Sequence, residues 1–160
     1  MECQSFRLTV EDAPTVEYIS RYLGQVQQKY TQRGGVRPFG ISTLIGGVGV
    51  DGIPQLWATD PSGTYTSWKA NAVGSKAKNL LELLEKQYKD NCDENDGLKL
   101  AVRVLLEVVE SGAKSIEIGV LRKGVPMTMV TDEVIENLVK TIEAEKAAEA
   151  AKNEGTSTSG

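Results

Sequence analysis

One short segment, Asp60-Pro61-Ser62-Gly63, constrains the fold of this chain more than any other, because it fixes a tight reversal between two runs of β-forming residues. Aspartate at the first position accepts hydrogen bonds from the backbone, proline presets φ at the second, and glycine is favoured at the fourth, as in a type I turn. The segment therefore predicts a β-hairpin with strands at 55–59 and 64–70. Trp57 and Trp68 lie on these strands as a candidate cross-strand pair, a placement typical of core or interface anchors.

The residues before the hairpin predict a helix and one more strand. Asp12 is expected to cap a helix over 13–32 that carries Pro14 in its first turn. A strand rich in Ile, Leu, Thr and Val follows at 39–48. Residues 1–9 are too short for an element of their own and resemble the end of a preceding one. The apolar stripe of the helix consists of Val16, Ile19, Leu23, Val26 and Tyr30.

The second half of the chain predicts three helices around a second hairpin. Ser75 and Thr131 are expected to cap the first and last of these helices. An acidic loop at 91–97 complements the N-terminal dipole of the middle helix, which Gly112 is expected to close. The three apolar stripes are Ala77, Leu80, Leu81, Leu84 and Tyr88; Leu98, Ala101, Val102, Leu105 and Val109; and Val134, Ile135, Leu138, Val139 and Ile142.

Alternating side chains predict the strands of that second hairpin at 115–122 and 125–130, with Pro126 marking an edge or a strand start. The order helix, three strands, two helices, two strands, helix implies sheets covered by helices, which is a layered α/β (α+β) fold. We expect one domain over 1–146. Residues 147–160 are expected to form a charged helix end and a tail, disordered from Gly155 onward, because they have nothing to bury.

Composition excludes several classes of function. The 160 residues include no histidine, which excludes Ser-His-Asp and Cys-His triads and the commonest zinc ligand sets. A net charge of −4 with scattered Lys and Arg argues against nucleic-acid binding. No apolar run approaches the roughly 18 residues that span a bilayer, and the first residues lack the charged-then-apolar pattern of a signal peptide. Because Cys3 and Cys92 indicate free thiols in a reducing compartment, we expect an intracellular protein without metal, cofactor or membrane partner.

The segment Gly47-Val48-Gly49-Val50-Asp51-Gly52 matches the glycine spacing of a dinucleotide-binding loop. That loop works because a helix begins directly after it and aims backbone N–H groups at a pyrophosphate. Here Pro54 and another strand follow instead. We interpret the segment as a flexible hairpin turn with a bulge.

Two further groups of polar residues permit a functional and a structural interpretation. Asp60, Ser62 and Lys69 place a carboxylate, a nucleophile and a base around one hairpin, but turn chemistry already accounts for the first two. Lys69 is expected to face solvent or a partner. A mixed-charge helix end is most simply a solvated face, with partner docking as the alternative. It is formed by Glu143, Glu145, Lys146, Glu149, Lys152 and Glu154.

Three blocks and the spacing between them resemble the α-type subunits of the proteasome. The blocks are Arg37-Pro38-Phe39-Gly40-Ile41-Ser42, Thr59-Asp60-Pro61-Ser62-Gly63-Thr64-Tyr65 and Trp68-Lys69-Ala70-Asn71-Ala72-Val73-Gly74. Segments at 2–5, 8–12, 84–88 and 105–112 most resemble the subunit at the fourth position of the eukaryotic α ring, and the likeness extends to about Lys146. The expected family or structural residues are Arg37, Pro38, Phe39, Gly40, Asp60, Pro61, Ser62, Gly63, Tyr65, Trp68, Lys69 and Gly74.

The resemblance implies an αββα sandwich of the N-terminal-nucleophile hydrolase type, here incomplete, in a seven-membered ring that caps the 20S core particle. It implies a non-catalytic subunit of the cytoplasm and nucleus that contributes to ring assembly and ubiquitin-dependent protein breakdown. Neighbouring α subunits and β-ring subunits are the implied partners, with regulatory particles as a further class. The exposed face of the helix at 13–32 is expected at the contact between the α and β rings.

The resemblance begins part-way into the family fold. Family members start with a gating tail, a short helix on the ring, four strands and most of a long helix, and all of these precede the segment that Met1 matches. Gate and docking functions are therefore not assigned to this sequence. A sandwich with about three strands of one sheet and two of the other leaves edges and apolar faces uncovered. We expect the isolated chain to be poorly stable or to aggregate.

Two rival functions remain open at this stage. A threonine peptidase needs a free N-terminal threonine, and cleavage at either Gly63-Thr64 or Gly155-Thr156 would leave no functional enzyme. The other rival is a free-standing protein-binding module that recruits partners through the acidic helix and tail at 143–160.

Overall fold

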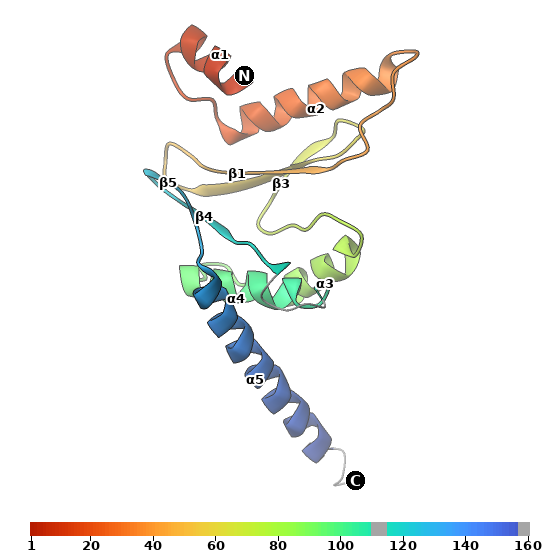
Figure 1. The fold of residues 1–160 in the computed structure, drawn as a ribbon. Coiled ribbons are helices and arrows are strands. Elements are labelled where there is room, and N and C mark those ends of the chain that lie inside the picture. Colours follow the sequence, from red (N-terminus) through yellow and green to blue (C-terminus); the bar gives the residue numbers. More distant parts are fainter. Residues whose placement is uncertain (110–114, 157–160) are drawn as a thin grey trace. The chain divides into compact units, whose positions relative to one another are not determined.

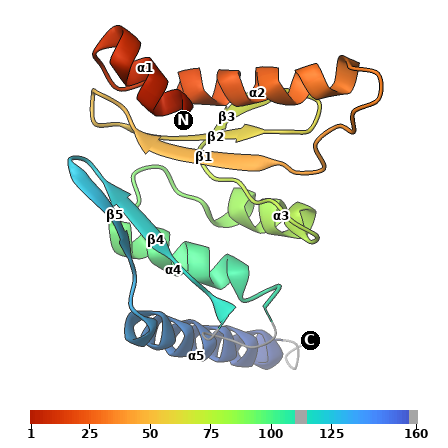
Figure 2. The same cartoon turned by 45° about the horizontal axis from the view of Figure 1, so that its top comes forward.

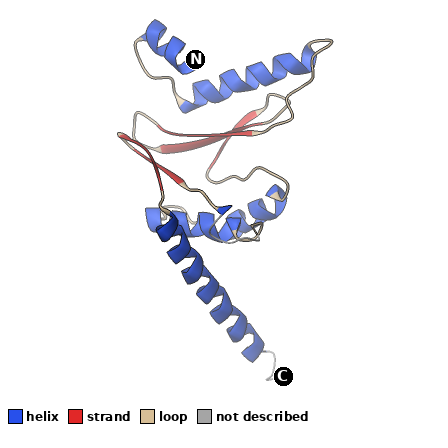
Figure 3. Ribbon diagram, viewed as in Figure 1, coloured by secondary structure: helices blue, strands red, loops and turns tan. Residues whose placement is uncertain are grey.

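The computed structural model describes residues 1–109 and 115–156, with side chains placed for 1–109 and 115–148. The chain divides into two compact units, the first comprising Met1–Ala77 with Leu121–Val125 and the second Lys78–Val120 with Pro126–Gly160. Helices and small antiparallel sheets make up the chain, in agreement with the predicted mixed α/β class (Figure 3). The element order adds one helix at the start to the predicted order.

The first unit contains an antiparallel sheet of strands β1 (Thr43–Val48), β2 (Pro54–Thr59) and β3 (Tyr65–Trp68), in that order (Figure 1). The hairpin prediction is confirmed, although β3 is shorter than expected. Strand β1 begins four residues later than predicted, and the segment before it contacts the preceding helix through the Phe39 ring and the Ile41 carbonyl. The Ile41 carbonyl accepts a hydrogen bond of 3.2 Å from Gln27 Nε2 instead of joining the sheet.

Helix α2 (Val16–Gln32) begins three residues later than predicted. Its N-cap is Thr15, whose hydroxyl accepts a 3.1 Å hydrogen bond from the Tyr18 N–H. The prediction that Asp12 caps this helix is therefore wrong, and Asp12 Oδ1 accepts from the adjacent Ala13 N–H at 2.7 Å. The reason is Pro14, which disfavours helical geometry in the residue before it and so delays the start of the helix.

Residues Glu2–Val10 form helix α1, which contradicts the expectation that this segment is too short for an element of its own. The helix buries no side chain. Two contacts hold it on α2: the Phe6 ring lies 4.5 Å from the Tyr18 ring, and the Tyr18 hydroxyl donates to a Glu2 carboxylate oxygen at 3.3 Å. Glu11, at φ 60°, ends the helix with its N–H bonded to the Arg7 carbonyl. Helix α1 is thus attached to α2 by an aromatic contact rather than by a buried apolar face.

Helix α2 runs along one face of the three-stranded sheet, as the two views in Figures 1 and 2 agree. The residues that it buries fully are Ser20, Gly24 and Gln27. The predicted apolar stripe is only half-buried, and its last member, Tyr30, is exposed. Small residues at the centre of the contact bring the helix backbone close to the sheet.

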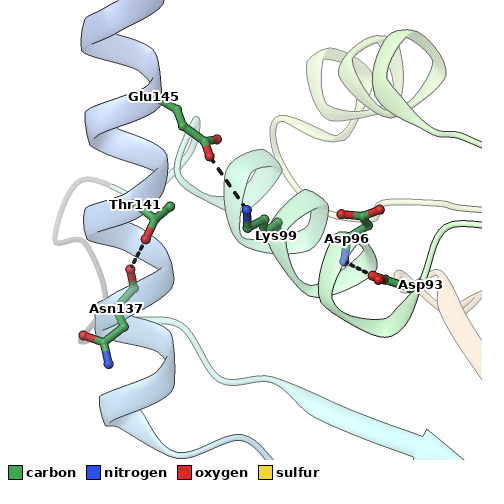
Figure 4. Close-up of polar contacts among 6 residues, drawn as sticks. All are labelled: Asp93, Asp96, Lys99, Asn137, Thr141 and Glu145. Carbon is green, nitrogen blue, oxygen red and sulfur yellow. Dashed lines mark hydrogen bonds and ion pairs between the residues drawn. The ribbon is translucent and has the colours of Figure 1, made fainter.

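The second unit contains helices α3 (Ala77–Gln87), α4 (Glu94–Leu105) and α5 (Asp132–Thr156). Helix α3 begins two residues after Ser75, so Ser75 is not its cap. Helix α4 starts inside the predicted acidic loop, because Asp93 caps it by accepting from the Asp96 N–H at 2.8 Å (Figure 4). Helix α5 begins directly after Thr131, as predicted.

Strands β4 (Gly119–Arg122) and β5 (Val125–Met129) form the second antiparallel pair, joined by a turn with Gly124 at φ 71°. β4 is shorter than predicted, although Ile116 and Ile118 before it are buried and the Ile118 carbonyl accepts from the Val130 N–H at 2.8 Å. The predicted burial of alternate side chains is therefore confirmed at Ile116 and Ile118, although the strand itself begins only at Gly119.

One aliphatic cluster forms the core of the second unit. Its buried members are Val102, Ile116, Ile118, Ile135, Val139 and Ile142. Val134 was expected in this core but is 44% exposed, because Ile135, Val139 and Ile142 set the buried face of α5 and Val134 lies about 100° away from it. Val104 is buried without having been predicted. Helix α5 extends to Thr156, into the segment expected to be disordered, while Gly112 and residues 157–160 lie outside the described residues.

Candidate functional site

The β2–β3 turn is held by the carboxylate of Asp60. Asp60 Oδ1 accepts from the N–H groups of Ser62 (2.8 Å) and Thr64 (3.3 Å) and from the Ser62 hydroxyl. The Gly63 N–H donates to the Asp60 carbonyl at 3.0 Å, and Gly63 itself has φ 94°. These bonds confirm the predicted turn, because each of the four residues performs the role that its position requires.

The same hydrogen bonds change the acidity of Asp60. The Ser62 hydroxyl, more than any other group, holds the pKa of the Asp60 carboxyl below its ordinary value. Burial, the next largest influence, raises this pKa, and the N–H groups of Ser62, Thr64 and Gly63 each lower it further. Hydrogen bonds donated to a carboxylate favour its charged form. The turn therefore holds Asp60 in its charged form, and this carboxylate in return satisfies the N–H groups of the turn.

Lys69 does not join Asp60 and Ser62. It follows the last residue of β3 and is exposed, at the end of the strand opposite the turn. At about 3.3 Å per residue, the four steps from Tyr65 to Lys69 place it roughly 13 Å along the strand from the turn. The structure thus separates the carboxylate and hydroxyl from the lysine that the sequence had placed in one candidate group.

A contact between two glycines, Gly24 of α2 and Gly63 of the turn, lies at the centre of the first unit. A Cβ atom added at Gly24 would stand 2.6 Å from the Gly63 carbonyl oxygen, and one added at Gly63 would stand 2.5 Å from the Gly24 carbonyl oxygen. Neither position therefore tolerates a side chain without movement of backbone. Sequence reasoning missed Gly24, although a glycine inside a helical pattern, four residues after a serine, was the available signal.

Aromatic residues of the sheet pack differently from the predicted pairing. The register places Trp57 opposite Ser67 and Trp68 opposite Leu56. Because successive side chains point to opposite faces of a sheet, the two tryptophans lie on different faces and the predicted cross-strand pair is wrong. Trp57 instead lies 6.0 Å from the Tyr65 ring, whereas Trp68 is 45% exposed and donates from Nε1 to Thr66 Oγ1 at 2.8 Å.

Three of the expected family residues contact α2. Phe39 packs edge-on against Tyr30 with ring centroids 4.7 Å apart, and Tyr65 and Gly63 lie next to Gly24. Arg37, Pro38 and Gly40 lie in an exposed connecting segment, where a Cβ on Gly40 would meet no described atom within 4 Å. Gly74 has φ 129°, a conformation that only glycine adopts readily. Phe39, Gly63 and Tyr65 thus link the first two motif blocks to α2.

The glycine-rich segment forms a hairpin turn between β1 and β2, as predicted. The Gly49 N–H donates to the Ile53 carbonyl at 2.9 Å, the Gly52 N–H donates to the Gly49 carbonyl at 2.9 Å, and Asp51 Oδ1 accepts from the Ile53 N–H at 3.0 Å. The β1–β2 ladder pairs every residue from Thr43 to Val48, so the predicted bulge does not lie within it. No helix follows to receive a pyrophosphate.

The charged end of α5 is engaged with the rest of its unit over the part whose side chains are described. Lys146 pairs with Glu107 of the segment after α4, and Glu145 lies 3.7 Å from Lys99 of α4 (Figure 4). Glu143 is exposed, as expected for a solvated face, and Glu149, Lys152 and Glu154 lie outside the described side chains.

Among the described side chains, those of residues 1–109 and 115–148, no three of the His, Cys, Asp and Glu types come together in a way that would hold a metal ion. Over the same residues, no helix is both long and apolar enough to span a bilayer.

Comparison with known proteins gives a consistent picture. The family model described as proteasome subunit matches residues 1–121. The chain is 58% identical over 146 residues to proteasome subunit alpha type-7 of Dictyostelium discoideum, 56% over 156 residues to alpha type-7 of Solanum lycopersicum, and 54% over 148 residues to alpha type-8 of Mus musculus. These alignments cover 91%, 95% and 91% of this chain.

The same alignments cover 58%, 59% and 59% of the relatives' own lengths, so the chain spans about three fifths of the curated relatives that it matches. The matched region nevertheless includes both motif-bearing strands, the turn and the helix that packs on them. With a family model that covers most of the chain and α-type relatives at more than half identity, the chain belongs to the proteasome subunit family and is of the α type.

Proposed function

We propose that this chain serves as a non-catalytic structural subunit of the α ring of the 20S core particle, at the fourth ring position, and contributes to ring assembly and ubiquitin-dependent protein breakdown. One observation carries the proposal: α-type subunits match 91–97% of the chain at 53–58% identity. Residues 1–146 form the family domain in this proposal, and the two small sheets belong to the layers of an αββα sandwich.

The position of Thr64 supports the non-catalytic assignment. A threonine peptidase requires its threonine at a free N-terminus, where the α-amine acts as base. Thr64 is inside the β2–β3 hairpin, its N–H donates to Asp60, and its hydroxyl lies 2.9 Å from Ser62 Oγ. Cleavage before Thr64 would cut the turn that holds the sheet on α2.

The exposed side of α2 is the surface that we assign to the contact with the β ring. Beside its buried residues, this helix carries exposed polar side chains along its length. The contact is therefore expected to depend on charge and hydrogen bonding. Neighbouring α subunits and, as a further class, regulatory particles complete the proposed partners, in the cytoplasm and the nucleus. The exposed face consists of Glu17, Arg21, Gln25, Gln28 and Lys29.

Native gel electrophoresis with mass spectrometry of the tagged endogenous protein tests the assembly role. We expect the protein in a ring-sized complex with both α and β subunits. If the protein migrates as a free chain and no proteasome subunit is recovered with it, the proposal is contradicted. If deletion of 143–160 abolishes every association and the remaining part binds no ring neighbour, the chain is a free-standing binding module instead.

Charge substitutions on α2 test the assigned surface. The double variant Gln25→Glu with Lys29→Glu is expected to reduce recovery of β subunits severalfold while α neighbours are retained. Lys140→Glu provides the matched control, because Lys140 is equally exposed but lies on α5. Equal loss of β subunits in both variants would show that α2 does not form this contact.

A further inference from the structure

A hollow of about 380 Å³ lies within the second unit, lined by the end of α3, the segment after it, α4 and α5. Its size is within the range of small-molecule sites in proteins, which begins at about 300 Å³. All of its lining residues belong to the second unit. The motif residues discussed above take no part in it.

The charge of this basic hollow is opposite to that of the whole chain. Four cationic side chains and two carboxylates line it, although the chain carries a net charge of −4. Lysine supplies most of the positive charge, and a lysine ammonium is a compact, mobile donor that suits phosphate oxygens. The cations are Lys86, Lys89, Lys99 and Arg103, and the carboxylates are Asp96 and Glu145.

The ion pair between Lys99 and Glu145 in this hollow is weak. Lys99 Nζ lies 3.7 Å from Glu145 Oε1, beyond hydrogen-bonding distance, and both side chains are more than two fifths exposed (Figure 4). Exposed pairs of this kind contribute little stability, about 0–1 kcal/mol. An incoming anion of higher charge density would therefore draw Lys99 away from Glu145 at small cost.

The floor of the hollow is apolar and fixed. Leu100 and Ile142 line it, and Ile142 is 1% exposed as part of the aliphatic core. Lys99 and Arg103 thus project from α4, which packs on α5 in this core, whereas Lys86 lies in the last turn of α3 and Lys89 in the segment after it. We infer that the basic hollow binds a small multivalent phosphate compound, whose charged oxygens meet Lys86, Lys89 and Lys99.

Two exposed cysteines allow a direct test, because one lines the hollow and the other does not. Cys92 is a lining residue, whereas Cys3 lies on α1. The rate of alkylation of each thiol by neutral iodoacetamide is measured by mass spectrometry on the full chain, with and without tripolyphosphate. Ionic strength is held constant, since added salt alone screens charges. We expect tripolyphosphate to slow alkylation of Cys92 at least threefold and to leave Cys3 unchanged.

Matched variants assign this protection to the hollow. Lys86→Glu is expected to abolish it, whereas Lys78→Glu, the same charge change on an exposed position of α3 outside the lining, is expected to retain it. Glu145→Gln removes the competitor of Lys99 and should lower the concentration for half-protection severalfold. Circular dichroism checks that each variant is folded, and Lys89→Glu replaces Lys86→Glu if the latter is not.

Two results would overturn the inference. The first is an equal change at Cys92 and Cys3, which would indicate a general effect of the anion. The second is undiminished protection of Cys92 in the folded Lys86→Glu or Lys89→Glu variant.

Discussion

The two units of this chain bury their interiors in different ways. In the first unit, the contact between α2 and the sheet buries Ser20, Gly24, Gln27 and Thr59, which are small or polar. In the second unit, the interior is a cluster of valines and isoleucines contributed by α4, the segment before β4, and α5. The first contact therefore depends on how closely two backbones approach, and the second on the volume of its side chains.

This difference predicts opposite responses to substitution. A close backbone contact has no space for added atoms, whereas an aliphatic cluster loses stability when atoms are removed. Chemical unfolding separates the two responses. Both tryptophans lie on the sheet of the first unit and report on it by fluorescence, while far-UV circular dichroism is dominated by helices such as α4 and α5.

The largest effect is expected at Ile135, which is 1% exposed in the aliphatic cluster. Ile135→Ala should lower the free energy of unfolding by about 3–4 kcal/mol, because it leaves a cavity among packed side chains. The adjacent Val134 is 44% exposed, so Val134→Ala should change stability by no more than about 0.5 kcal/mol. Urea unfolding followed by circular dichroism measures both. Similar losses in the two variants would mean that α5 packs on a different face.

The second effect concerns the glycine contact. Gly24→Ala should destabilise the first unit by about 2 kcal/mol, since the new methyl group meets the Gly63 carbonyl oxygen and the clash exceeds the gain in helix propensity. Gly97→Ala is the matched control, because Gly97 also lies within a helix but has open space around its Cβ position. It should stabilise by about 0.5–1 kcal/mol. Stabilisation by Gly24→Ala, read from tryptophan fluorescence, would refute the close contact.

Local features of the fold could be predicted from the sequence, whereas contacts between elements could not. The Asp60–Gly63 turn is encoded in four adjacent residues, and the structure shows the hydrogen bonds that those residues imply. The start of α2 was misplaced because Pro14 was weighed as a helix-initiating residue and not as a restraint on Ala13. The contact of Gly24 with Gly63 depends on tertiary approach, for which glycine's low helix propensity gave only an indirect signal.

The register of the β2–β3 hairpin is another local feature that follows from the sequence of the turn. Once the turn closes Thr59 on Tyr65, Trp57 must lie opposite Ser67, so the two tryptophans fall on different faces. The turn alone therefore determines on which face of the sheet each tryptophan lies. The basic hollow could not be predicted in this way, because its cations come from α3, the segment after it and α4, and only the folded chain brings them together.

A smaller effect is expected at Thr59, which is 1% exposed beneath α2. Its hydroxyl finds no hydrogen-bond partner among the described residues, so it carries a desolvation cost without compensation. Thr59→Val preserves the shape and should stabilise the first unit by about 1 kcal/mol. Thr66→Val on β3 is the contrast, because it removes the acceptor of the Trp68 Nε1–H and should bring no gain. Equal gains in both variants would indicate strand propensity alone.

The smallest expected effect is a pH dependence at the exposed turn. Because the pKa of Asp60 is lowered in the folded chain, chiefly by the Ser62 hydroxyl, its contribution to stability is fully present above the ordinary aspartate pKa and is lost as pH falls through the lowered value. Asp60→Asn should therefore be less stable than the parent chain near neutral pH, and this difference should vanish in acid. Ser62→Ala should shift the loss to higher pH. Urea unfolding followed by tryptophan fluorescence, repeated from neutral pH downward, measures the difference in free energy of unfolding between Asp60→Asn and the parent chain. If this difference stays constant with pH, the backbone of the turn and not its carboxylate has the stabilising role.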